Sequence, residues 1–149
     1  MILSKNQYYV IVFIILALAI ARIFPHPPNF TPILGMAVFA GTFIGKKTFA
    51  YLIPLVAMFL SDLYLGFHSG MPIIYFSLAL CVLIGTFIGA RSTILIYILG
   101  ISAGVIVFYL ITNFAVWYGS GMYDYTFSGL ITCYVMALPF LQNTIISSM

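Results

Sequence analysis

Residues 21–35 read ARIFPHPPNFTPILG and place four prolines within eight positions, between one apolar segment and the next. A proline has no backbone N–H and pushes the residue before it toward extended backbone, so this stretch is not expected to be helical. It also carries an arginine, a histidine, an asparagine and a threonine, in a chain with few polar groups. We predict a stiff connection between two helices. It is either a loop that closes over a ligand or a rigid connector that caps the helices.

The composition on both sides of this connection is that of a membrane protein. Of the 149 residues, 64% are hydrophobic and 5% are charged, whereas a soluble domain carries about 25% charged residues. We therefore predict an all-α integral membrane protein in which residues 1–149 form a single transmembrane domain. The basic residues form no patch, so the expected surroundings are the lipid bilayer and no nucleic-acid partner is predicted.

Prolines, glycines and charges divide the chain into six predicted transmembrane helices. Their expected bounds are residues 8–24, 33–45, 48–65, 72–90, 92–117 and 129–146. A membrane crossing takes roughly 20 helical residues. The second helix is therefore marginal, and we expect it to be tilted, broken or partly buried by its neighbours.

The basic residues predict the orientation, because short cytoplasmic loops are enriched in Lys and Arg. With the N-terminus inside, Lys5, Lys46, Lys47 and Arg91 all face the cytoplasm and only Arg22 faces outward. Both termini are then cytoplasmic. The loops that face outward are residues 25–32, 66–71 and 118–128.

Asp62 is predicted to lie about one turn from the outer end of helix 48–65. An ionisable group inside a membrane helix costs about 2.5 to 3.5 kcal/mol on insertion scales and is usually functional or paired. Two interpretations remain open: Asp62 belongs to a binding site, or it forms an interfacial ion pair with Arg22.

His26 and His68 follow the first and third predicted helices, on the same side as Asp62. Each is a candidate metal ligand, a pocket residue or an ordinary loop histidine. A metal site needs three or four such ligands. Asp124 could complete the set, but no ligand pair has the i, i+4 spacing of a helical site.

Two further residues have a structural and a functional interpretation. Cys81, near the middle of helix 72–90, is either a small buried hydrophobe or a thiolate ligand for a metal held between helices. Trp117 and its neighbouring tyrosines are either an interfacial aromatic belt or walls around a planar ligand.

Small residues recur at four-residue spacing, which lets helix backbones approach closely. The sequence GTFIG occurs at 41–45 and again at 85–89, and Ala17 and Ala21 have the same spacing. These positions serve internal packing or a partner protein. No nucleotide-binding or hydrolase motif occurs, so we predict that the chain is not an enzyme and that any active transport needs a partner or an ion gradient.

The six short helices, the small size, the cytoplasmic N-terminus, the Ala17–Ala21 pair and the outer loop resemble the S components of energy-coupling factor (ECF) vitamin transporters. These are substrate-binding proteins of the bacterial cytoplasmic (inner) membrane. The resemblance implies an S-component-like bundle that takes up a vitamin. It also implies that Ala17 and Ala21 dock on a coupling subunit, which acts with ATPases.

The runs RIFPHPPNFTP (22–32) and SDLYLGFH (61–68) are similar to a group of uncharacterised bacterial membrane proteins described as transporters, and to BtuM-type cobalamin S components. In the latter a membrane cysteine ligates cobalt. The resemblance implies cobalamin as substrate, Cys81 as the cobalt ligand and His26 and Asp62 in the pocket, although Tyr75 could occupy the ligand's position instead.

We therefore expect capture of a small organic molecule from the outer side, with residues 25–32 as the lid of the pocket. The predicted substrate-binding residues are Arg22, His26, Asn29, Asp62, His68, Tyr75 and Trp117. One alternative is a subunit that transports or binds cobalt, nickel or zinc. The other is a non-transporting accessory subunit that buries its small residues against partner chains.

Overall fold

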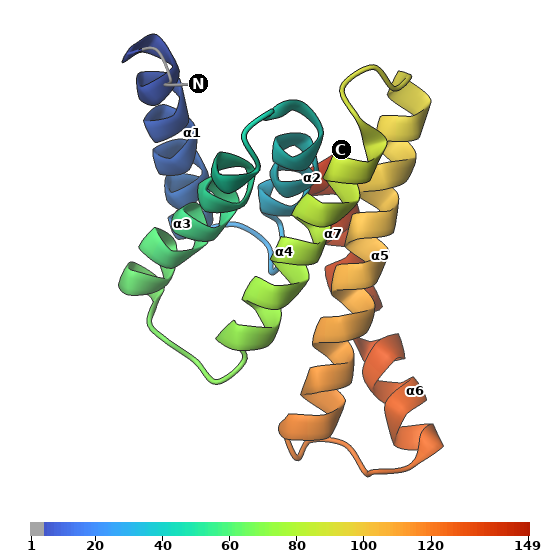
Figure 1. Ribbon diagram of the computed structural model, residues 1–149. Coiled ribbons are helices and arrows are strands. Elements are labelled where there is room, and N and C mark those ends of the chain that lie inside the picture. Colours follow the sequence, from blue (N-terminus) through green and yellow to red (C-terminus); the bar gives the residue numbers. More distant parts are fainter. Residues whose placement is uncertain (1–4) are drawn as a thin grey trace.

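The computed structural model describes residues 5–149, and these residues contain helices and no strand (Figure 1). The helices are α1 (Lys5–Ile23), α2 (Ile33–Phe43), α3 (Lys47–Leu65), α4 (Met71–Ile88), α5 (Ile94–Gly119), α6 (Phe127–Met136) and α7 (Leu138–Ser148). The predicted all-α fold class is confirmed. The side chain of Lys5, one of the charges used to predict the orientation, lies outside the described part.

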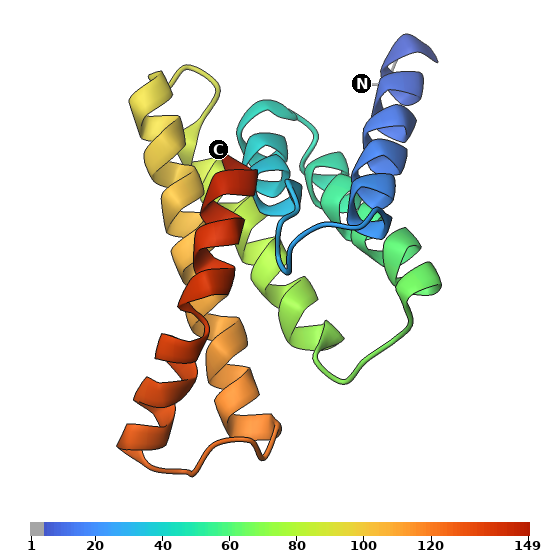
Figure 2. The ribbon, with the colours of Figure 1, turned by 180° about the vertical axis from the view of Figure 1, so that it is seen from behind.

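The helices run back and forth between two ends of the molecule (Figures 1 and 2). The α2–α3 and α4–α5 connections lie at the end that also holds the start of α1 and the end of α7, and Lys46, Lys47 and Arg91 lie in or next to these connections. We call this the basic end. The α3–α4 and α5–α6 connections lie at the opposite end, which we call the open end. The proline-rich connection, residues 24–32, lies deeper in the molecule than those two connections.

Three helices, α3, α4 and α5, are long and apolar enough to cross a membrane. The predicted final helix, residues 129–146, is not continuous: α6 and α7 meet at a bend of 44° and together can form a fourth span. The bend falls at Ala137, two residues before Pro139, which cannot donate the hydrogen bond of a continuing helix. The described residues thus agree with a helical membrane protein of three or four spans.

The short helix α2 occupies the middle of the bundle. Its 11 residues span only about 16 Å at 1.5 Å per residue, so it cannot cross a hydrocarbon core alone. It packs against α3, α4, α5 and α7, and its Ala37 and Val38 are completely buried. The expectation that neighbouring helices bury this segment is confirmed.

Glycines allow α2 to lie directly against α4. A Cβ atom added to Gly41 would lie 2.0 Å from the carbonyl oxygen of Val82, and one added to Gly85 would lie 2.1 Å from that of Val38. The Thr42 hydroxyl donates to the Gly85 carbonyl at 3.1 Å. The two GTFIG copies therefore pack against each other, and each supplies the glycine that the other helix requires. We call this contact the glycine seam.

Candidate functional site

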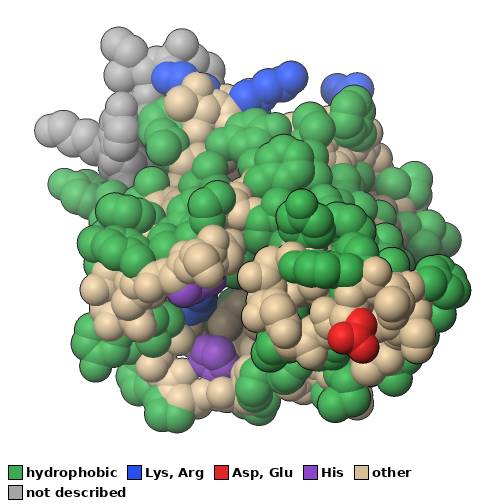
Figure 3. All heavy atoms as spheres, turned by 90° about the horizontal axis from the view of Figure 1, so that it is seen from below, with side chains coloured by type: hydrophobic (Ala, Val, Ile, Leu, Met, Phe, Trp, Pro, Cys, Tyr) green, Lys and Arg blue, Asp and Glu red, His purple; other side chains and the backbone are tan. Residues whose placement is uncertain are grey.

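A hollow of about 160 Å³ lies between α1, α3, α4 and the proline-rich connection. Seen from the open end, basic and histidine side chains are visible inside it (Figure 3). Its polar lining comes from Arg22, His26, Asn29, Thr31 and Thr144. Its apolar lining comes from Ile33, Leu34, Met58, Leu65, Ile74, Leu78 and Phe108.

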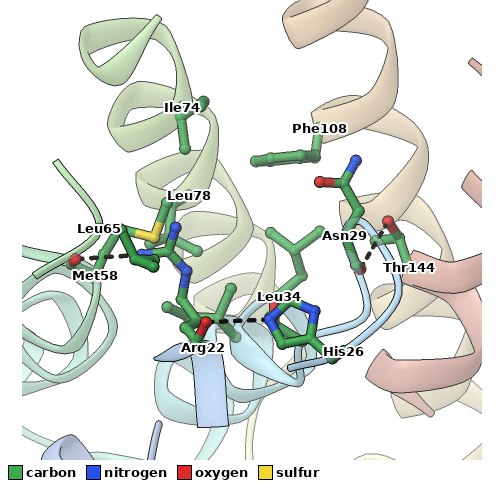
Figure 4. Close-up of a pocket in the computed structure, with 12 residues that line it drawn as sticks. Arg22, His26, Asn29, Leu34, Met58, Leu65, Ile74, Leu78, Phe108 and Thr144 are labelled. Carbon is green, nitrogen blue, oxygen red and sulfur yellow. Dashed lines mark hydrogen bonds between the residues drawn. The ribbon is translucent and has the colours of Figure 1, made fainter. Parts of the chain in front are cut away.

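The proline-rich connection forms one wall of this hollow through a tight turn. The Phe30 amide donates to the Pro27 carbonyl at 3.0 Å, and Asn29 has φ 60°. Proline in the second position and a left-handed residue in the third define a type II turn, in which asparagine is tolerated. Figure 4 shows the Asn29 side chain extending toward Phe108, across the space of the hollow.

Helix α7 holds the same connection from behind. Asn143 donates to the Pro28 carbonyl at 3.0 Å, Thr144 to the Asn29 carbonyl at 3.4 Å, and Ser147 to the Thr31 carbonyl at 3.1 Å. Because prolines supply no N–H, carbonyls in this segment need donors from elsewhere. In this structure the segment is therefore a wall of the hollow that α7 holds in place.

His26 also fixes the connection. Its Nδ1 lies 2.8 Å from the Pro27 carbonyl. Its Nε2 lies 3.1 Å from the Arg22 carbonyl, a contact drawn in Figure 4. Both ring nitrogens therefore face backbone acceptors of the chain itself. His26 lines the hollow as predicted, but neither nitrogen is directed at a metal ion.

Arg22 joins α1 to α3 and α4 through a buried polar network. Its Nη1 donates to the Asp62 carboxylate at 2.8 Å, to the Met58 carbonyl at 3.3 Å and to the Ser61 hydroxyl. The Tyr75 hydroxyl donates to the other Asp62 oxygen at 2.8 Å. Asp62 is only 1% exposed, so its charge is paired inside the bundle. Asp62 and Tyr75 support Arg22 and do not line the hollow.

A second cavity of about 290 Å³ adjoins the hollow, with Asn29, Ile74 and Phe108 in both linings. It extends between α5 and the bend of α6 and α7. The rest of its lining is mostly apolar and consists of Thr112, Asn113, Val116, Met122, Tyr123, Cys133, Met136, Ala137 and Phe140. Together the two cavities fall within the roughly 300–1,000 Å³ of a small-ligand pocket.

Two predicted substrate-binding residues, His68 and Trp117, are in the lining of neither cavity. His68 is exposed in the α3–α4 connection. Trp117 donates from Nε1 to the Asp124 carbonyl at 2.9 Å and packs against Phe114 and Tyr125, so its ring stabilises the α5–α6 connection. Neither residue is in the lining of the hollow or of the adjoining cavity.

Cys81 lies in the core of the bundle and not at a cavity wall. It is completely buried, and its thiol donates to the Gly104 carbonyl at 3.4 Å. Among the described residues, no group of three or more His, Cys, Asp or Glu side chains is placed to hold a metal ion.

Some polar lining residues were not among the predicted ones, notably Asn113 and Thr144. Polar side chains inside apolar helices were the available signal, in Asn113 of α5 and in the QNT run at 142–144. Phe108 gave no signal, because an aromatic residue in an apolar helix is most often ordinary packing.

A larger groove of about 820 Å³ lies near the basic end, between α1, α2 and α3. Among the described residues of its lining, Asn6 and Lys46 are polar and the others are apolar or glycine. Specific small-ligand sites combine apolar walls with a few convergent polar groups. The hollow has this character, whereas the groove does not.

On α1, the two predicted docking residues differ in exposure: Ala17 is exposed and Ala21 is partly buried.

The fold and site define a helical membrane protein with a partly polar hollow at one end. Residues 3–149 match a family of unknown function, DUF6580, and the chain belongs to this family. No curated protein and no solved structure matches the chain.

Proposed function

We propose that this protein binds a small organic molecule in the hollow and acts as the substrate-binding membrane component of an uptake system. The observation that carries the proposal is the hollow itself. Polar side chains of Arg22, Asn29 and Thr31 line it together with apolar residues of α4 and α5. The expected ligand class is a vitamin or a molecule of similar size.

The proposed orientation places the open end outside and the basic end in the cytoplasm. Lys46, Lys47 and Arg91 at the basic end support it, because basic residues accumulate in cytoplasmic loops. The six membrane segments would be α1 to α5 and the bent pair α6–α7. The hollow would then take its ligand from the outer side of a bacterial cytoplasmic membrane.

Active uptake would require a partner, because the sequence contains no nucleotide-binding motif. By the resemblance to ECF S components, this partner is a coupling subunit with its ATPases. The exposed position of Ala17 on α1 supports a contact there. The alternative of a non-transporting accessory subunit would use the same exposed residue but would leave the hollow without a ligand.

Cobalamin is the more specific expectation, and it requires that the thiol of Cys81 reach the bound ligand. Cys81 borders neither cavity, so α4 and α5 would have to separate for its thiol to reach a cobalt ion. A visible absorption spectrum of the gently purified protein tests this form directly. Corrinoid bands that disappear in Cys81→Ser would support it.

The general proposal is tested by identifying small molecules that remain bound during mild purification, by mass spectrometry. Ile74→Trp would fill the hollow and the adjoining cavity, because Ile74 lines both. Phe76→Trp is the matched control on α4, since Phe76 is exposed. We expect wild type and the Phe76 variant to retain a ligand and the Ile74 variant to lose it. A bound metal ion without any organic ligand would favour the metal-ion alternative instead.

A further inference from the structure

The hollow has a charge asymmetry that points to the chemical class of its ligand. We propose, on the basis of the ligand-binding function above, that it selects small organic anions. The anionic group, a carboxylate or another oxyanion, would bind at Arg22, and an apolar body would occupy the adjoining cavity. The argument depends on which charges face the hollow and which are turned away from it.

The guanidinium of Arg22 still has donors to offer. All three of its hydrogen bonds within the described part of the chain start from Nη1 and run toward α3. A guanidinium carries five N–H donors in a planar fork that matches an oxyanion, so the donors of Nε and Nη2 are not used by these bonds. Arg22 is 15% exposed and borders the hollow beneath Ile74 and Leu78 (Figure 4).

The balancing negative charge is not accessible from the hollow. Both carboxylate oxygens of Asp62 are engaged, one with Arg22 and the other with Tyr75. The carboxylate is buried and absent from the lining. A ligand therefore meets the guanidinium first and is farther from the carboxylate. Asp62 holds Arg22 in place and, within the described part of the chain, leaves the donors of its Nε and Nη2 unoccupied.

No acidic side chain borders either cavity in the described structure. Two further donors line the same hollow: the amide of Asn29, which Figure 4 shows beside Phe108, and the hydroxyl of Thr31. Neither side chain hydrogen-bonds to another described group, because the Asn29 and Thr31 contacts with α7 use their backbone carbonyls. The polar lining of the hollow thus includes the guanidinium of Arg22 and the uncharged donors of Asn29 and Thr31.

The adjoining cavity suits the uncharged part of such a ligand. Ile74 and Phe108 stand between the two spaces and belong to both linings. Beyond them, Val116, Met136 and Phe140 supply apolar surface. An amine would be repelled by Arg22, and a neutral amide would forgo a charge-assisted hydrogen bond, which is about twice as strong as a neutral one.

The test is retention of defined compounds by the purified protein in detergent. The probe is an equimolar mixture of small carboxylic acids, each present with its primary amide and its amine counterpart. Fatty acids of increasing chain length are included. Bound compounds are identified by mass spectrometry after gel filtration. We expect carboxylates to be retained at least about tenfold more than their amides, and amines not to be retained.

The decisive variant is Arg22→Gln combined with Asp62→Asn, which removes both charges and keeps hydrogen-bonding groups on both sides. We expect it to lose the preference for carboxylates while gel filtration and circular dichroism still show a folded protein. Arg91→Gln is the matched control, because it removes an exposed cation at the basic end. If the double variant does not fold, Thr31→Val and Asn29→Gly remove the two uncharged donors one at a time, and each should weaken carboxylate retention; glycine keeps the left-handed backbone of residue 29.

The possible results separate the two proposals. Equal retention of acids and amides, abolished by Ile74→Trp, would overturn anion selection and leave the binding function standing. Retention of no compound by the folded protein would overturn both. Retention of long-chain fatty acids alone would support anion selection but identify the bilayer as the source of the ligand.

Discussion

The two ends of α4 are built in opposite ways. Toward the basic end, Gly85 lies against α2 so closely that an added methyl group would collide with the Val38 carbonyl. Toward the open end, Ile74 borders two cavities and Tyr75 reaches across to Asp62 of α3. One end is closed by backbone contact, and the other is held apart by side chains.

This difference explains how a small bundle keeps a cavity. In a bilayer, apolar side chains gain little by moving from lipid to protein, so helix contact depends on close packing and hydrogen bonds. The glycine seam supplies the close packing between α2 and α4. The polar network of Arg22, Asp62 and Tyr75 supplies directional bonds at the other end without filling the space.

The largest expected effect comes from breaking the polar network of Arg22, Asp62 and Tyr75. Asp62→Ala leaves the partly buried guanidinium of Arg22 without its counter-charge, and breaking a fully buried ion pair this way costs about 3–5 kcal/mol. We expect Asp62→Ala to lower the free energy of unfolding in detergent by about 3 kcal/mol. Tyr75→Phe removes only one donor and should cost about 1 kcal/mol. Equal effects would show that the ion pair does not hold this end together.

The next largest effect is expected from breaking the glycine seam between α2 and α4. Gly85→Ala should force α2 and α4 apart, because its Cβ would lie 2.1 Å from the Val38 carbonyl. Overpacking of this kind typically costs about 1–3 kcal/mol. Gly45→Ala is the matched control, since Gly45 has no atom within 4 Å of an added Cβ. Thermal unfolding should be lowered only in the first variant; an unchanged midpoint would contradict the close contact.

A smaller effect is expected where α7 holds the proline-rich connection. Ser147→Ala removes the hydrogen bond to the Thr31 carbonyl, and a single hydrogen bond contributes about 0.5–1.5 kcal/mol. Ser102→Ala is the control, because Ser102 donates only to its own helix, at the Ile98 carbonyl. We expect the first variant alone to increase hydrogen exchange in residues 24–32. Equal exchange in both would mean that α7 does not restrain the wall of the hollow.

The smallest effect is expected for His68, and His26 is the residue to compare it with. His68 is exposed and borders neither cavity, so His68→Ala should change the unfolding free energy by less than about 0.5 kcal/mol. Ligand retention should stay the same. His26→Ala should lower the unfolding free energy and ligand retention, because the two ring nitrogens of His26 lie against backbone carbonyls next to the hollow. A loss of ligand in the His68 variant would instead show that His68 takes part in binding.

The sequence predicted those parts of the site that depend on local chemistry. Four prolines excluded a helix at residues 25–32, and their missing N–H groups made this segment dependent on outside donors. An aspartate inside an apolar helix required a partner, and the ion pair with Arg22 was one of its two interpretations. His26 and Asn29 were correctly placed at the hollow because they lie in the proline-rich segment itself.

The rest could not be predicted, because it depends on which helix faces meet. Cys81 and Ile74 belong to the same apolar helix, yet one is in the core and the other borders both cavities. Trp117 turned toward the Asp124 carbonyl, a contact set by the shape of the α5–α6 connection. The same holds for the donors of α7, which come more than 100 positions after the carbonyls they reach.

The sequence by itself thus determined a helical membrane chain, a non-helical polar segment near residue 26 and a buried charge that needed pairing. These follow from solvation and backbone chemistry, which act residue by residue. Only the tertiary structure decided that the two GTFIG copies pack against each other and that Arg22 keeps donors toward a hollow. Those outcomes depend on distances between helices, and contacts in the folded bundle set these distances.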